Sequence, residues 1–200
     1  MFTGIITNIG EVVATDGGRM TIACSYSPES IVLGASIACD GCCLTVTGIE
    51  GEQENGCRFL VDVSNETLGH TTLGSWKPGR RINLERALTL QDELGGHMVS
   101  GHVDAVATIK DRQEDGESFR FTIDFPADLA HLVAQKGSVA LDGVSLTVND
   151  VEDACFSVNL VPHTLGATTW GSKSEGDAVN LEVDLLARYV ARISTIANRN

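Results

Sequence analysis

Apolar and β-branched residues occur along this chain in short runs, and turn residues separate the runs. In the first half the separators include Asp16-Gly17-Gly18, Asp40-Gly41 and Pro78-Gly79. Short runs bounded by turn signals, in a chain with 21 glycines, are typical of a small β-sandwich or closed barrel. The pattern predicts strands over Ile5–Ala14, Ser36–Ala38, Leu44–Ile49, Phe59–Val63 and Arg81–Glu85.

The end of the chain, LLARYVARISTIANRN, follows a different pattern. Its apolar positions are separated by gaps of one, three and four, which place them on one stripe of a helix. The first half of the chain has no counterpart. Such a helix either packs on its own domain or joins subunits into an oligomer. The stripe consists of Leu185, Leu186, Tyr189, Val190, Ile193 and Ile196.

The chain contains an internal repeat. Thr67-Leu68-Gly69 aligns with Thr164-Leu165-Gly166, and Asn83-Leu84-Glu85 aligns with Asn180-Leu181-Glu182, both at an offset of 97. The segment from Ser36 to Gly41 aligns with the segment from Ser138 to Gly143 at an offset of 102, so the second copy carries a local insertion. We therefore expect two similar domains that arose by duplication. Their predicted bounds are residues 1–95 and 96–186, followed by an oligomerisation helix over residues 187–200.

Composition narrows the possible partners and the compartment. The net charge of −13 argues against nucleic acid and anionic membranes, because both attract basic surfaces. No apolar run approaches the roughly 20 residues of a membrane span, and Met1-Phe2-Thr3-Gly4 does not resemble a signal peptide. Six unevenly distributed cysteines suggest reduced thiols rather than a disulfide framework. These observations predict a cytoplasmic protein.

Small polar residues occur at matching places in the two copies. Alternate side chains of a strand share a face, so Cys43 and Thr45 point one way, as do Ser145 and Thr147 in the second copy. These residues either line a groove or form a satisfied Thr ladder beside a small buried Cys. His102 takes the place of Ile5 of the first copy, which is a titratable residue where the duplicate is apolar.

Motifs for metals and nucleotide cofactors are not evident. Cys39 and Cys42 form a C-x-x-C, but the second copy has Leu141 and Val144 at those positions, and no second pair completes a zinc site. His97 and His102 are five residues apart in a strand-like stretch, which does not suit a ligand pair. The chain shows no P-loop, Rossmann glycine motif or Ser-His-Asp signature. We therefore predict neither a metal nor a cofactor.

The ordered combination of MFTGI, SIACDGCCLTV, SVALDGVSLTV, ERAL, GGHMVSGHVD, PHTL and NLEVDLLARYV resembles the riboflavin synthase family. The resemblance runs from Met1 to Tyr189. It implies an all-β chain of two tandem, similar six-stranded Greek-key β-barrels plus a C-terminal α-helix, assembled as a homotrimer. Each active site then lies between the N-terminal barrel of one subunit and the C-terminal barrel of a neighbour. Residues 7 and 8 are Thr-Asn where the family often has acidic residues.

The resemblance also implies a reaction. Two molecules of 6,7-dimethyl-8-ribityllumazine dismutate to riboflavin and 5-amino-6-(D-ribitylamino)uracil by transfer of a four-carbon unit. The C7 methyl of the substrate is acidic because its anion delocalises into the ring. The protein then needs to hold two flat rings together and move protons. Lumazine synthase is a further implied partner.

The family's site residues are carried over by motif. The first lumazine is expected to contact Gly4, Ile5, Ile6, Cys43, Leu44, Thr45, Asp62, Ser64 and Thr67. The second is expected to contact Gly101, His102, Val103, Lys136, Ser145, Leu146, Thr147, Val161, His163 and Thr164. Phe2 and Asp184 are further candidates near the joint site. The expected catalytic residues are His102 and Ser145 for proton handling, with Cys43 or Thr45 activating the water or nucleophile on the other substrate. Thr147 is a further expected catalytic residue.

Two other functions share parts of this pattern. A non-catalytic lumazine- or flavin-binding protein has the same duplicated barrels, but with one site eroded. Here both copies keep a Gly, a small nucleophilic or hydroxylic residue and an LTV. A flavin-dependent reductase with a related barrel needs a nucleotide-binding domain, for which no motif is present. The sequence therefore favours the enzyme.

Overall fold

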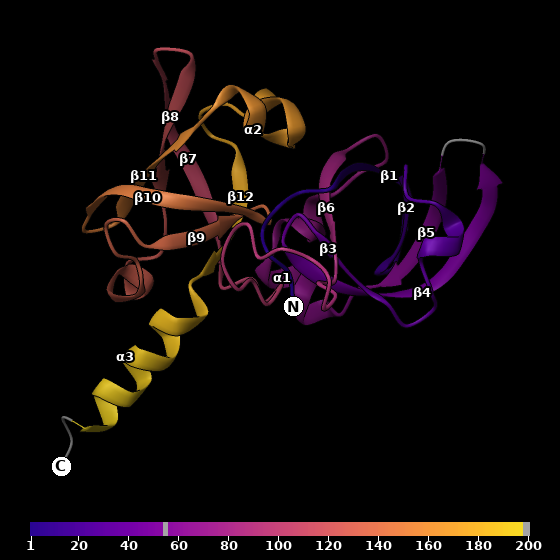
Figure 1. The fold of residues 1–200 in the computed structure, drawn as a ribbon, viewed down its shortest axis with the longest axis horizontal. Coiled ribbons are helices and arrows are strands. Elements are labelled where there is room, and N and C mark those ends of the chain that lie inside the picture. Colours follow the sequence, from indigo (N-terminus) through magenta and orange to yellow (C-terminus); the bar gives the residue numbers. More distant parts are fainter. Residues whose placement is uncertain (54–55, 198–200) are drawn as a thin grey trace.

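The repeat folds into two closed barrels of six antiparallel strands. A computed structural model describes residues 1–53 and 56–197. The barrels lie side by side, and the C-terminal helix extends from the second one (Figure 1). The first barrel contains β1 (Asn8–Asp16), β2 (Arg19–Cys24), β3 (Ser36–Cys39), β4 (Cys42–Gln53), β5 (Gly56–Asp62) and β6 (Arg81–Arg86). The second contains β7 (Ala105–Asp115), β8 (Ser118–Asp124), β9 (Ser138–Leu141), β10 (Val144–Glu152), β11 (Cys155–Leu160) and β12 (Ala178–Val183).

Both barrels have the same strand order. In the first, β1-β2-β5-β4-β3-β6 closes on itself, and the second gives the equivalent order β7-β8-β11-β10-β9-β12. Three consecutive strands followed by one that returns beside the first of them is a Greek key. The predicted fold class is therefore confirmed, and closure into barrels decides against the sandwich.

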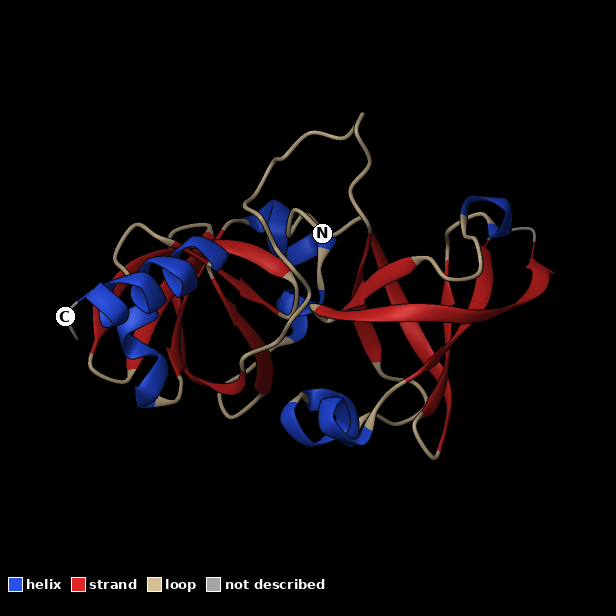
Figure 2. Ribbon diagram, turned by 90° about the horizontal axis from the view of Figure 1, so that it is seen from below, coloured by secondary structure: helices blue, strands red, loops and turns tan. Residues whose placement is uncertain are grey.

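Short helices connect the strands at equivalent places, as Figure 2 shows. One α-helix follows β5 and another follows β11, and each leads into a 3₁₀ turn. These elements are α1 (Asn65–His70) with η2 (Thr72–Ser75), and α2 (Pro162–Ala167) with η4 (Thr169–Ser172). The other 3₁₀ turns are η1 (Pro28–Ser30) and η3 (Ala127–Leu132).

Predicted and observed strand ends in the first barrel differ by up to four residues, and the structure has one further strand there, β2. The first strand begins at Asn8 rather than Ile5, because the amide of Ile5 donates to the hydroxyl of Thr3, at 3.1 Å, and not to a neighbouring strand. The strand β2 was not predicted. Its alternating buried residues, Met20, Ile22 and Cys24, carry the signal, but the run is short and begins directly after a turn.

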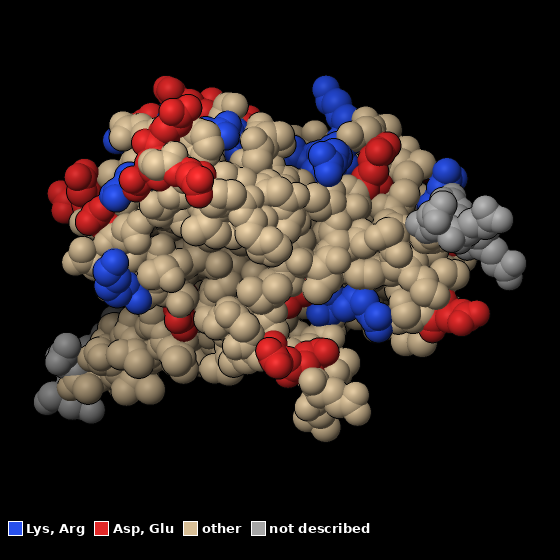
Figure 3. Space-filling view, turned by 45° about the horizontal axis from the view of Figure 1, so that its top comes forward, with Lys and Arg blue, Asp and Glu red and all other residues tan. Residues whose placement is uncertain are grey.

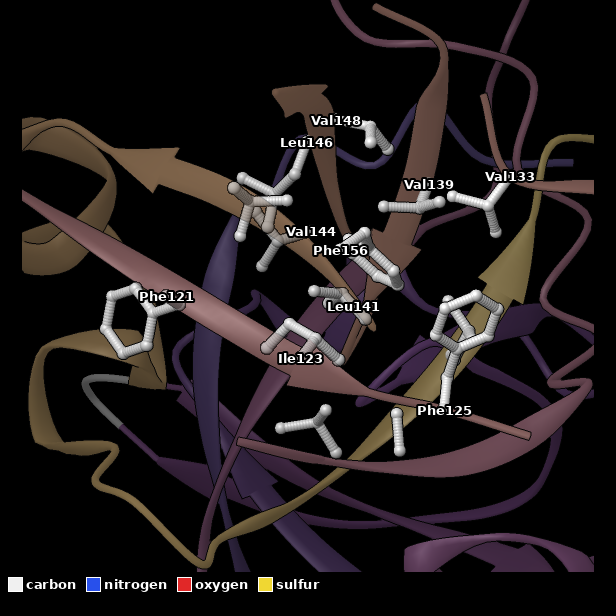
Figure 4. Close-up of a cluster of buried hydrophobic side chains, with 14 of the residues drawn as sticks. Phe121, Ile123, Phe125, Val133, Val139, Leu141, Val144, Leu146, Val148 and Phe156 are labelled. Atoms are coloured by element: carbon white, nitrogen blue, oxygen red, sulfur yellow. The ribbon is translucent and has the colours of Figure 1, made fainter. Parts of the chain in front are cut away.

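Each barrel encloses its own apolar core. The second core is built from inward-facing residues of β7 to β12, including Phe121, Ile123 and Phe156 (Figure 4). The ring of Phe121 packs edge-on against Trp170 of η4, with 5.0 Å between centroids. The first core has the same plan, with Phe59 of β5 in it, completely buried. Burying one such aromatic side chain stabilises the fold by about 2–3 kcal/mol.

Each repeat begins with a segment that lies against the barrel of the other repeat. These exchanged segments include residues 4–6 of the first repeat and residues 101–103 of the second. The amide of Ser145 in β10 donates to the carbonyl of Gly4 at 2.8 Å, so the first segment lies against the second barrel. Reciprocally, the amide of Cys43 in β4 donates to the carbonyl of Gly101 at 2.8 Å. Ile6 packs against the core of the second barrel, and Val103 packs against the core of the first.

A small third core fills the space between the barrels. Phe2, completely buried, contacts Val99 through an isolated antiparallel bridge, and Ala38 and Ala140 complete the cluster. The two halves are therefore related by an approximate twofold axis within one chain.

Two buried asparagines link the barrels. The side-chain amide of Asn83 donates to the carbonyl of Asp142 at 3.0 Å, and its oxygen accepts from the amide of Thr169 at 2.8 Å. Asn180 forms the same pair of bonds with Asp40 and Thr72, both at 2.8 Å. Each asparagine thus satisfies backbone groups of the opposite barrel.

The C-terminal helix is confirmed as α3 (Leu185–Ala197). Ala187 and Ala191 pack against the second core, and Arg188 pairs with Asp104 at 2.6 Å. No helix in residues 1–53 or 56–197 has the length and apolarity of a membrane span. On the face in Figure 3, basic side chains lie in small separate groups with acidic ones nearby, so that face presents no continuous basic patch.

The contact between two Asp-Gly turns at the centre generates a stability prediction. Gly41 has φ +80°, and a Cβ there comes within 2.7 Å of the amide nitrogen of Gly143. Gly41→Ala should therefore lower the free energy of unfolding by about 2 kcal/mol or more, because both backbone strain and a backbone clash result. Urea denaturation measures this loss.

Gly79→Ala is the matched control. Gly79 has φ +90° with open space around its Cβ position, so only the backbone strain remains. Equal losses of stability in the two variants would contradict a tight contact between the turns.

Candidate active site

A hollow of about 370 Å³ lies at one end of the first barrel, where the exchanged segment of the second repeat meets it. Its lining combines β4, α1 and the exchanged segment. The main lining residues are Cys43, Thr67, Gly101, His102 and Val103.

The alternation of β4 positions Cys43 in this hollow. Cys43 is half-buried and Thr45 is exposed, whereas Leu44 and Val46 point into the first core. The second barrel repeats this arrangement in β10, where Ser145 is half-buried and Thr147 exposed. The predicted sharing of a face is confirmed for both pairs.

The side chains of Leu44 and Leu146, two predicted ligand contacts, do not face the hollow or its equivalent in the second barrel. Both side chains are buried in the barrel cores, at 5% and 8% exposure. They can therefore offer a ligand only their backbone atoms.

The helix α1 places the other predicted residues of the first barrel. Ser64 caps the helix, since its hydroxyl accepts from the amide of Thr67 at 3.1 Å. Asp62 pairs with Arg19 at 2.9 Å and lines a separate hollow with Gly17 and Gly18, so the structure does not place it with Cys43.

The structure groups the exchanged segments the other way round from the sequence prediction. The prediction placed Gly4, Ile5 and Ile6 with Cys43, and Gly101 to Val103 with Ser145. Instead, Gly101 bonds to Cys43, and Gly4 bonds to Ser145. The repeat alone could not show this, because matching residues in two copies do not reveal which barrel a segment contacts.

The remaining predicted residues lie at equivalent or nearby places in the second barrel. Val161, His163 and Thr164 lie at the start of α2, with Val161 and His163 exposed. Lys136 has a left-handed backbone, φ +64°, where the first copy has Gly34. A left-handed conformation costs roughly 1–2 kcal/mol in a residue with a Cβ. The amide of Lys136 donates to Val148, next to Thr147.

One polar residue of the site was missed. His97 lies beside Ser145, with 2.7 Å between its Nδ1 and the serine hydroxyl. Burial lowers the pKa of His97 from its usual 6.5, while Asp184 acts in the opposite direction. In the sequence, His97 stands out only as a poor candidate for a metal ligand. The GGHMVSGHVD segment contains His97, but its hydrogen-bond partner Ser145 lies 48 residues further along the chain, so the sequence does not show the pair.

The C-x-x-C cysteines belong to the core. Cys39 and Cys42 are cross-strand partners on either side of the Asp40-Gly41 turn, and both are buried. Burial raises the pKa of Cys42 to about 12 and raises that of Cys39 well above its usual value. Buried thiols that keep their protons are poor metal ligands.

Comparison with known proteins gives this architecture a class. The lumazine binding domain family matches the chain twice, at residues 3–87 and 100–184. A solved structure of LumP in complex with riboflavin superposes with a TM-score of 0.78 at 24% identity, covering 92% of this chain and 99% of that one. LumP complexed with 6,7-dimethyl-8-(1'-D-ribityl) lumazine superposes with a TM-score of 0.76 at 23% identity, with the same coverage. The class is therefore that of proteins with two lumazine-binding domains.

Sequence relatives define the family within that class. Riboflavin synthase of Brucella abortus is 52% identical over 198 residues, covering 97% of this chain and 98% of that protein. The Bacillus subtilis riboflavin synthase is 38% identical and covers all of this chain and 93% of that protein. The chain belongs to the riboflavin synthase family.

The buried position of His97 generates a prediction about its titration. Burial disfavours the charged imidazolium, so the folded protein should protonate His97 only below pH 6.5, and the ring should be neutral at pH 7. Nitrogen-15 NMR of the imidazole rings across this pH range measures the midpoint. The His97→Gln variant identifies the resonance by its absence.

A midpoint at or above 6.5 would contradict this prediction. It would mean that the carboxylate of Asp184 outweighs burial.

Proposed function

We propose that each barrel of this enzyme binds one molecule of 6,7-dimethyl-8-ribityllumazine at the place where it receives the segment of the other repeat. As a member of its family, the enzyme transfers a four-carbon unit between two such molecules, giving riboflavin and 5-amino-6-(D-ribitylamino)uracil. The observation that carries the placement is the hollow at Cys43, where groups from both repeats converge. The approximate twofold axis implies a second place at Ser145.

The proposed contacts follow this grouping. In the first barrel, Cys43, Thr45, Ser64 and Thr67 face the substrate together with Gly101, His102 and Val103, and Leu44 contributes backbone atoms. In the second barrel, Ser145, Thr147, Val161, His163 and Thr164 do so together with Gly4, Ile5 and Ile6, and Leu146 contributes backbone atoms. Lys136, which keeps a strained backbone conformation, is a further proposed contact.

The chemistry asks the protein to orient two rings and to move protons. The acidic C7 methyl of the substrate loses a proton, and an imidazole is suited to accept it. His102 supplies an imidazole in the hollow with Cys43. In the second barrel, His97 and Ser145 form a hydrogen-bonded pair in which the ring keeps the hydroxyl oriented. Holding the two reactants together offsets up to about 7–11 kcal/mol of the barrier.

A non-catalytic lumazine-binding protein remains the alternative function. LumP has the same fold at 23–24% identity, whereas the synthases of Brucella abortus and Bacillus subtilis are 52% and 38% identical. Both barrels here also present a small nucleophilic or hydroxylic residue, Cys43 or Ser145. These observations favour catalysis.

We further propose that the enzyme is a homotrimer held by α3. Its side chains Leu186, Tyr189, Val190, Ile193 and Ile196 are all exposed, between 49% and 67%. An apolar stripe of this kind gains about 25 cal/mol per Å² when it is covered by another subunit. In a trimer, the first barrel of one subunit would face the second barrel of a neighbour and bring two bound rings together.

Compartment and pathway partner are also proposals. The six cysteines are free thiols, and the sulfurs of Cys24 and Cys57 are 3.7 Å apart, at hydrogen-bond distance and not in a disulfide, which supports a reducing compartment such as the cytoplasm. Lumazine synthase is the proposed supplier of the substrate. The acidic net charge supports neither nucleic acid nor membrane as a partner.

The proposed function is tested with the lumazine as sole substrate. The purified protein, chelated with EDTA and desalted, should form one riboflavin for every two lumazines consumed, because neither a metal nor a nucleotide takes part. Absorbance and chromatography measure both compounds. A protein that binds lumazine but forms no riboflavin would be a carrier, and activity restored only by zinc would contradict the metal-free mechanism.

The exposed stripe of α3 generates a prediction about assembly. Replacing Tyr189, Val190 and Ile193 with Ser should give folded monomers, because the association then loses its apolar area. Riboflavin formation should fall at least tenfold, while riboflavin binding to each barrel remains. Sedimentation velocity and an activity assay on the same sample measure both effects.

Replacing Thr195 and Ala197, which lie outside the stripe, with Ser gives a control that should stay assembled and active. A stripe variant that remains trimeric, or a monomer with full activity, would contradict the role of α3.

A further inference from the structure

The repeated motif Asn-Leu-Glu ends in a glutamate that the reaction does not use. Glu85, in β6, is 4% exposed. Its Oε1 accepts from the amide and the hydroxyl of Thr3, both at 2.6 Å, and its Oε2 accepts from the amide of Gly4 at 2.9 Å. One carboxylate therefore holds both residues at the start of the first exchanged segment.

Glu182, in β12, does the same for the second exchanged segment. Its Oε1 accepts from the amide and the hydroxyl of Ser100, both at 2.6 Å. Its Oε2 accepts from the amides of Gly101 and His102, at 2.9 and 3.0 Å. The side chain is 3% exposed.

The chemistry of these contacts requires a carboxylate. Each glutamate receives only N–H and O–H donors, and among the described residues neither forms an ion pair with a Lys, Arg or His. Burial raises the pKa of Glu85, and the donors from Thr3 and Gly4 act in the opposite direction. A carboxylate accepts hydrogen bonds on both oxygens. A carboxamide in its place has one accepting oxygen, and its NH₂ group would face a backbone N–H that is itself a donor.

The segments held in this way lie on the opposite barrel. Glu182 belongs to the second barrel, but Gly101 and His102, which it holds, line the hollow of the first barrel with Cys43. Glu85 belongs to the first barrel, but Gly4, which it holds, bonds to Ser145 of the second. A glutamate of one barrel thus fixes one wall of the binding place in the other barrel.

We propose that Glu182 and Glu85 are positioning residues with crossed control, Glu182 for the pocket at Cys43 and Glu85 for the pocket at Ser145. This inference rests on the proposed placement of one ligand in each barrel. Neither glutamate touches the ligand. Each sets the turn whose backbone and side chains do so.

The test compares riboflavin binding at the two pockets separately. Hydrogen–deuterium exchange, followed by mass spectrometry of peptides, reports each pocket during a riboflavin titration. In the unmodified protein, riboflavin should protect peptides over residues 42–46 and 65–71, and also peptides over residues 144–148 and 162–168.

Glu182→Gln should weaken only the first pocket. Protection over residues 42–46 and 65–71 should require about tenfold to hundredfold more riboflavin, because charge-assisted hydrogen bonds to the Gly101 turn are lost. Protection over residues 144–148 and 162–168 should be unchanged. Glu85→Gln should give the mirror result, with the second pocket weakened and the first unchanged.

Milder and neutral variants guard against general damage to the fold. Ser100→Ala removes only the hydroxyl that donates to Glu182, so it should shift the first pocket in the same direction by a smaller factor. Glu175→Gln, at an exposed turn, should change neither pocket. Because the glutamates act through the segments, Glu182→Gln and Glu85→Gln should raise KM and leave the pH dependence of turnover unchanged.

The outcomes separate this inference from the placement on which it rests. The crossed control is overturned if a glutamate variant weakens riboflavin protection at both pockets or at neither. It is also overturned if the variant weakens protection at the pocket of the glutamate's own barrel. If riboflavin protects neither set of peptides in the unmodified protein, the placement of the ligands is overturned as well.

Discussion

Each barrel leaves backbone groups unpaired that only the other barrel can satisfy, and the whole structure depends on this reciprocity. A buried amide or carbonyl without a partner costs about 1–3 kcal/mol. Asn83 and Asn180 pair such groups across the interface, each with one donor and one acceptor bond. The apolar cluster around Phe2 excludes water from the same interface. The relative position of the barrels is therefore set by directional bonds, with burial supplying the driving force.

This reciprocity also shapes the places where ligands are proposed to bind. A barrel closed by six strands has no open edge to offer a ligand, and the hollow at Cys43 forms where the other repeat meets the barrel rim. Here the exchanged segments meet the rims, and they bring residues that the barrel itself lacks. His102 reaches the hollow of Cys43 in this way, and Gly4 reaches Ser145. Duplication thus supplied two barrels and also one wall of each binding place.

Much of the fold could be predicted from the sequence, because local patterns determine it. Alternation in β4 and β10 predicted that Cys43 shares a face with Thr45, and Ser145 with Thr147, and the structure agrees. The spacing of the apolar residues from Leu185 onward predicted α3. The repeat predicted two equal domains, since similar sequences adopt similar folds.

The arrangement of the site depends on contacts between distant parts of the chain, and no local pattern records those. His97 and Ser145 are 48 residues apart, and Glu182 lies 82 residues from Ser100. The repeat revealed that Gly4 and Gly101 are equivalent, but equivalence is the same whether each segment stays on its own barrel or crosses to the other. Only the three-dimensional structure distinguishes these two arrangements.

The crossing of the segments has a consequence for how the chain acquires its structure during synthesis. Residues near Gly4 leave the ribosome well before their partner Ser145, which is made only after the whole first barrel. The link from Asn180 to Asp40 likewise spans 140 residues. Contacts this far apart in sequence form late, because closing a long loop costs entropy before any contact compensates it. The leading segment of the first barrel must therefore stay uncovered until Ser145 has been translated, and the carbonyl of Asp40 until Asn180 has been translated.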